Sequence, residues 1–101
     1  MSLADLLTED RRLVILRALD EAPAKVLNEA VLQAMLSALG HVVGRDIVRA
    51  DLTWLEAHAL LRLEHLELGA ERKLWRAELR AEGEDVARGR IHPGVKQRGA
   101  D

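Results

Sequence analysis

Apolar residues recur at helical spacing in three stretches of the first part of the chain. The first stretch opens at Thr8, a favourable N-cap, and ends before Pro23. The second opens at Asn28, another favourable N-cap, and stops at Gly40. The third carries apolar residues spaced four, three and four apart, at Val48, Leu52, Leu55 and Ala59. The pattern predicts helices over residues 8–21, 28–39 and 45–58.

The period of the apolar pattern changes after Ala59. Leu61–His65 alternates apolar and polar residues, and Leu74–Arg80 can alternate again, as half-buried strands do. The sequence therefore predicts a β-hairpin over residues 61–80 with its tip at 68–73, followed by a short helix near residues 82–88. The expected fold class is mainly α with a small β-hairpin.

The 101 residues are enough for one domain with one core, because 49% of them are hydrophobic. We expect residues 1–90 to form this domain and residues 91–101 to form a basic, irregular C-terminal tail. No apolar run is long enough to span a bilayer, and the N-terminus lacks the features of a signal peptide. We therefore expect a cytoplasmic protein with no membrane partner. The absence of cysteine excludes disulfides and thiolate metal sites.

Net charge counts against nucleic-acid binding. The chain carries 15 basic and 17 acidic side chains, a formal net charge of −2. Nucleic-acid binders usually present a basic field to the phosphates. Only residues 86–101 are locally basic, with four basic side chains and one acidic side chain. Any affinity for DNA must therefore come from a few well-placed arginines.

Two segments are similar to known regulators. Gly44–Glu56 resembles the recognition-helix segment of bacterial winged-helix repressors, and Arg12–Leu19 is similar to the first helix of ArsR-like regulators. With Gly89-Arg90 and Pro93–Lys96 in the tail, residues 8–96 resemble the small winged helix-turn-helix proteins of Mu-like prophages. Three helices followed by a hairpin is also the element order of a winged helix.

The resemblance implies a DNA-binding transcriptional regulator that acts on double-stranded DNA as a homodimer. In such proteins the third helix enters the major groove and the hairpin, or wing, follows the phosphates. Carried over by position, Arg45, Arg49 and Thr53 face DNA from the third helix, and Arg72 and Lys73 contact it from the wing tip. Arg49 is expected to be a solvated surface residue, so its replacement by alanine should leave folding nearly intact.

Three residues depart from the repressor pattern and keep an alternative open. Gly44 stands where a serine can cap the helix and touch phosphate, and Ala50 stands where a second arginine is frequent. Ala59 stands where a glycine commonly ends this helix, and alanine in a left-handed conformation costs about 1 kcal/mol. The alternative is a winged-helix protein-interaction module without DNA binding. A positive stripe on the third helix and wing would favour DNA, and an acidic or apolar face would favour a protein.

The sequence gives little support for metal binding or catalysis. The four histidines, His41, His58, His65 and His92, lack the paired spacing of a metal site, and no cysteine accompanies them. The sequence has no Gly-rich phosphate loop, its only serines are Ser2 and Ser37, and its acidic residues are scattered over the predicted helix surfaces. We therefore expect no metal, no cofactor and no enzymatic activity.

The sequence also gives expected positions for the two tryptophans and for several apolar residues. Trp54 and Trp75 are expected to fill the core rather than to stack on bases, because no phenylalanine or tyrosine is available. Apolar residues of the first helix and of the C-terminal segment are expected to meet across the axis of a dimer: Leu3, Leu6, Leu7 and Val86.

Overall fold

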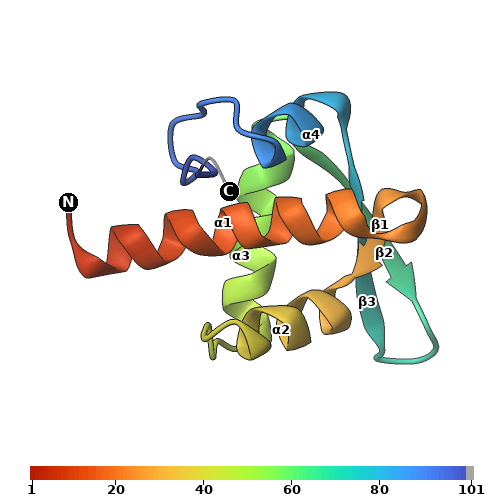
Figure 1. Cartoon of the computed structure of the whole chain (residues 1–101). Coiled ribbons are helices and arrows are strands. Elements are labelled where there is room, and N and C mark those ends of the chain that lie inside the picture. Colours follow the sequence, from red (N-terminus) through yellow and green to blue (C-terminus); the bar gives the residue numbers. More distant parts are fainter. Residues whose placement is uncertain (100–101) are drawn as a thin grey trace.

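The computed structural model describes residues 1–99 (Figure 1). Within these residues, four α-helices and a three-stranded antiparallel sheet form one α+β domain. The elements are, in order, α1 (Leu3–Glu21), the short 3₁₀ turn η1 (Pro23–Lys25), β1 (Val26–Asn28), α2 (Glu29–Ala38), α3 (Arg45–Ala57), β2 (Leu61–Glu67), β3 (Lys73–Leu79) and α4 (Ala81–Ala87). In this part of the chain, no helix is long and apolar enough to cross a membrane.

The helices α1 and α2 begin at residues whose side chains cap them. The backbone N–H of Val31 donates to the Asn28 side chain at 3.0 Å, which confirms the predicted start of α2. The prediction for α1 is wrong by more than one turn, because the helix begins at Leu3 rather than at Thr8. Ser2 and Asp5 form a capping box, in which each side chain accepts from the other's backbone N–H.

The predicted hairpin is confirmed, and it forms part of a larger sheet. Strands β2 and β3 pair in antiparallel register from Leu61 opposite Leu79 to Glu67 opposite Lys73. The strand β1 was not predicted; it pairs with the other edge of β3, which gives the order β1-β3-β2. Three residues are too short to show a period of two, so the expected two-stranded hairpin is corrected to a three-stranded sheet.

The core lies between the helices and one face of the sheet. It contains leucines and Ile15 from α1, leucines of α2 and α3, and Ala77 and Leu79 from β3. Trp54 and Trp75 pack against this core and are partly buried, as core-filling residues are expected to be. The chain leaves α3 through Ala59 in the left-handed conformation, with φ of 60°.

The C-terminal segment after α4 contains no helix or strand in its described part, residues 88–99. It nevertheless packs on the domain. Val95 is buried in the core, the Lys96 N–H donates to the Glu9 carbonyl at 3.1 Å, and Arg12 Nη1 donates to the Gly94 carbonyl at 2.9 Å. Residues 91–96 therefore belong structurally to the domain, while residues 100–101 of the predicted tail lie outside the described residues.

One residue of the predicted dimer interface is misplaced. Val86 is buried in the core with 1% of its surface exposed, so it cannot meet a second copy. Leu3, Leu6 and Leu7 are exposed, and the first turns of α1 project beyond the other elements in Figure 1.

Candidate functional site

The five residues predicted to contact DNA lie on two parts of the molecule. Arg45, Arg49 and Thr53 follow one another by single turns along α3. Arg72 is in the turn between β2 and β3, and Lys73 is the first residue of β3. The three α3 residues are thus brought together on one helix, and the other two lie at the tip of the hairpin.

A buried carboxylate holds Arg49. Glu29, the first residue of α2, has no solvent-exposed surface. Its Oε1 accepts from Arg49 Nε at 2.6 Å and its Oε2 accepts from Arg49 Nη2 at 2.9 Å, a bidentate pair. The backbone N–H of Trp75 donates to the same Oε2 at 2.6 Å. Glu29 therefore links α2, α3 and β3 through one carboxylate.

The electrostatics of Glu29 follow from these contacts. Burial alone would raise its pKa, because it disfavours the charged form. The hydrogen bonds from Arg49 and from the Trp75 N–H, together with the positive charges of Arg49 and Arg45, outweigh burial and hold the pKa of Glu29 below its ordinary value. The hydrogen bond to Glu29 in turn raises the pKa of Arg49. The pair is charged at neutral pH.

Arg45 is also engaged, though less fully. Its Nε donates to Gln33 Oε1 at 2.7 Å, and its Nη1 lies 3.8 Å from Glu29 Oε1. Gln33 donates in turn to the Val43 carbonyl at 3.1 Å. The Arg45 side chain is 40% exposed and that of Arg49 is 32% exposed, so both guanidinium groups reach solvent while they are paired.

These contacts change the interpretation of Arg49. It is not the freely solvated residue that the sequence suggested, because it neutralises a buried charge and also lies over the Trp75 ring, 4.8 Å from its centroid. The sequence offers one signal for Glu29, an acidic residue in the first turn of a helix. That signal does not indicate a partner in α3.

The other predicted residues are exposed. The Thr53 hydroxyl donates to the Arg49 carbonyl of its own helix at 2.8 Å. Arg72 and Lys73 are exposed at the hairpin tip, and within residues 1–99 neither forms an ion pair. They share this tip with the carboxylates Glu67 and Glu71.

The outward face of α3 is acidic and apolar. Its exposed side chains include Asp46, Ile47, Ala50 and Ala57 besides Thr53. Glu56 is exposed as well, and it accepts from the backbone N–H of Leu63 at 2.7 Å. On the solvent-reaching surface of this helix and the hairpin tip, four cationic side chains accompany four carboxylates: Arg45, Arg49, Arg72 and Lys73 with Asp46, Glu56, Glu67 and Glu71. The surface carries no positive excess.

A second polar cluster joins α3 to α1. Asp51 is almost fully buried, and its carboxylate accepts from Arg11 Nε at 2.6 Å, with Arg12 Nε at 3.8 Å. Arg12 also lies over the Trp54 ring, 3.8 Å from its centroid. These contacts hold α3 against α1.

The histidines do not form a metal site. His58 stacks on Trp54 with ring centroids 3.8 Å apart, and His92 meets both rings edge-on. His41 pairs with Asp10 at 2.6 Å, and His65 stacks on Trp75. Among residues 1–99, no group of three or more potential ligands comes together around a metal position.

Comparison with known proteins places the chain among phage proteins. No protein-family model matches it, and no solved structure shows significant similarity to it. It is 45% identical over 94 residues to the uncharacterized protein gp26 of Escherichia phage Mu, and the match covers 92% of each chain. It is also 45% identical over 69 residues to an uncharacterized protein of Haemophilus influenzae, covering 68% of this chain and 67% of the relative. The predicted likeness to proteins of Mu-like phages is thus confirmed, and the chain belongs to the family of phage Mu gp26.

Proposed function

We propose that this member of the gp26 family is a winged helix that binds a protein partner through the outward face of α3. The element order α1-β1-α2-α3-β2-β3 and the strand order β1-β3-β2 support the winged-helix assignment. In that assignment α2 and α3 are the helix-turn-helix and the β2–β3 hairpin is the wing.

The observation that carries the proposal is the pairing of the α3 arginines within the chain. DNA affinity comes largely from cations that replace counterions at phosphates. Arg49 is paired with Glu29 and Arg45 with Gln33 and Glu29, while Asp46 places a negative charge on the same face. A duplex approaching this helix would meet a surface whose charges cancel.

The same face has the chemistry of a small protein contact. Ile47, Ala50 and Ala57 are exposed and short or apolar, so a partner can approach the helix backbone closely. Asp46 near one end and Glu56 near the other flank this strip. The partner that fits is a protein surface with a shallow apolar patch and basic side chains at its edges.

Site-specific photo-crosslinking tests the proposal. A photoreactive amino acid at Ala50 should produce a protein adduct when the chain is expressed in Escherichia coli cells in which phage Mu is growing. The matched control is the same amino acid at Arg62, an exposed residue of β2 on a different element. A nuclease-sensitive adduct at Ala50, or the same adducts from both positions, would contradict the proposal.

A second candidate is the DNA-binding transcriptional regulator. The exposed and unpaired side chains of Arg72 and Lys73 at the wing tip favour it, as does the partial exposure of Arg45. In that case Arg45 and Arg49 would exchange Glu29 and Gln33 for phosphates or base edges when DNA binds. The exchange would leave the buried carboxylate of Glu29 without its arginine partner, and the cost of that isolated charge would offset the new interactions with DNA.

A further inference from the structure

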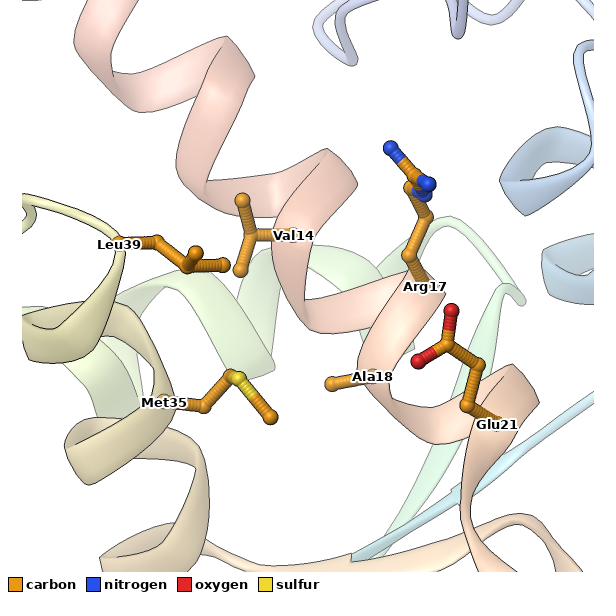
Figure 2. Close-up of a pocket in the computed structure, with 6 residues that line it drawn as sticks. All are labelled: Val14, Arg17, Ala18, Glu21, Met35 and Leu39. Carbon is orange, nitrogen blue, oxygen red and sulfur yellow. The ribbon is translucent and has the colours of Figure 1, made fainter. Parts of the chain in front are cut away.

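Two apolar features of α1 lie outside the α3 face. One is a depression between α1 and α2 of about 230 Å³, lined by Val14, Ala18, Met35 and Leu39, with Arg17 and Glu21 at its edge. Figure 2 shows the four apolar side chains directed into the space between the helices and the two charged side chains to one side of it. We refer to these six residues as the α1–α2 groove. Met35 and Leu39 are 39% and 59% exposed, so the groove is open to a partner.

The other feature is the beginning of α1. Leu3, Leu6 and Leu7 are 71%, 50% and 42% exposed, and this segment projects from the domain in Figure 1. The capping box of Ser2 and Asp5 fixes it as helix. A short helix gains most of its stability from packing of its apolar face, and these leucines find little packing in their own chain.

The two features lie on one face of α1. Leu3, Leu7 and Val14 are spaced four and seven residues apart, so they point in nearly the same direction from the helix axis. The projecting leucines and the groove therefore form a single stripe, which supplies protruding side chains at one end and a depression at the other. Such a surface is complementary to itself after a two-fold rotation.

We propose that two copies of this chain associate through α1 in antiparallel orientation. In this arrangement Leu7 of each copy lies against Val14 of the other, and Leu3 of each copy lies in the other's groove near Ala18 and Met35. One two-fold contact covers both features of both chains at once. The proposal uses no residue of α3 or the wing, so it stands independently of the partner of α3.

The charged residue in the middle of the stripe does not oppose this contact. Asp10 lies between Leu7 and Val14 on the same face, and two copies bring their Asp10 residues near the axis. Each carboxylate is already hydrogen-bonded to His41 Nε2 at 2.6 Å, and Lys96 Nζ lies 3.5 Å away. The negative charge is therefore satisfied within its own chain and points toward the turn before α3.

The expected contact is small. The 19 residues of α1 make a helix about 28 Å long and about 10 Å wide, so contact along it, with part of α2, buries on the order of 500 Å² per copy. A total of about 1,000 Å² is at the lower limit for a specific interface. We expect a dimer with a micromolar dissociation constant.

Sedimentation equilibrium of the full chain provides the first test. The wild type should pass from monomer to dimer over the micromolar range. Leu7→Glu should weaken the dimer at least tenfold, whereas the matched control Leu68→Glu, at a comparably exposed leucine (47% against 42%) on the wing, should not. A wild type that stays monomeric up to a protein concentration of about 100 μM, or equal effects of the two variants, would overturn the proposal.

Disulfide trapping provides the second test and fixes the orientation. The chain has no cysteine, so Leu3→Cys combined with Met35→Cys introduces the only thiols. Met35 lines the groove together with Ala18, and residues 3 and 18 are about 22 Å apart along α1. The two thiols of one chain are therefore too far apart to form a disulfide with each other. Mild oxidation should give a covalent dimer in high yield, and the control pair Leu3→Cys with Leu68→Cys should not. Equal yields from the two pairs would overturn the antiparallel arrangement.

Discussion

Replacing Arg49 by alanine removes the principal partner of a carboxylate that has no contact with water. The bidentate contact of Glu29 is lost, and only the Trp75 N–H at 2.6 Å and Arg45 at 3.8 Å remain. Breaking a fully buried ion pair costs about 3–5 kcal/mol. Arg49 is 32% exposed, so water can partly take its place, and we expect a loss of about 2–3 kcal/mol.

Urea unfolding monitored by tryptophan fluorescence measures this loss, because Trp75 lies beside the deleted group. A domain of this size has a free energy of unfolding of about 5–15 kcal/mol, so the expected change is easily resolved. The matched control is Arg62→Ala, which breaks the exposed pair with Glu78 and should cost less than about 1 kcal/mol. If Arg49→Ala costs no more than Arg62→Ala, the structural role assigned to Glu29 and Arg49 is wrong.

Three further predictions concern the same fold. The pKa of Glu29 is lowered in the folded state, so its contribution to the free energy of unfolding is present above its ordinary pKa of 4.5 and is lost as the pH falls through the lowered pKa. The urea midpoint should therefore fall as the pH is lowered below 4.5, and it should fall less in Arg49→Ala. Gly83→Ala would place a Cβ 1.9 Å from the Leu60 carbonyl oxygen, so the free energy of unfolding should fall by at least about 1–3 kcal/mol. An unchanged thermal midpoint would contradict this close approach. In Gly94→Ala the new Cβ would lie 2.6 Å from the Trp54 ring, in a backbone with φ of +86° that alanine rarely adopts. Limited proteolysis should therefore cleave the C-terminal segment earlier in Gly94→Ala than in the control Gly99→Ala, whose new Cβ has no neighbour within 4 Å.

Helices and strands could be predicted wherever neighbouring residues supply an N-cap or a periodic pattern of apolar residues. Asn28 and the apolar spacing of α3 are such signals, and both led to helices that the structure contains. The start of α1 also has a local signal, because Ser2 and Asp5 are residue types that form a capping box, although the apolar pattern predicts the start at Thr8. These features depend on residues within one or two helical turns of each other.

The parts that could not be predicted depend on contacts between distant residues. The strand β1 exists because Val26 pairs opposite Glu78, more than fifty positions away, and three residues carry no periodic signal. The pairing of Arg49 with Glu29 and the burial of Val95 have the same origin. An arginine on the polar side of a helix looks the same in sequence whether it meets DNA, solvent or a buried carboxylate.

The measurement that most directly tests the assignment of α3 is DNA binding by fluorescence anisotropy, with a labelled duplex of about three helical turns from the region upstream of the gene and a scrambled duplex of the same length. At salt concentrations of about 50 and 200 mM, we expect the same weak binding to both duplexes, with dissociation constants no tighter than the nonspecific range of about 10⁻⁴ to 10⁻⁶ M. A dissociation constant near 10⁻⁸ M for the upstream duplex alone, lost in both Arg45→Ala and Arg72→Ala, would contradict the proposed protein-binding role of α3 and would establish the DNA-binding regulator in its place.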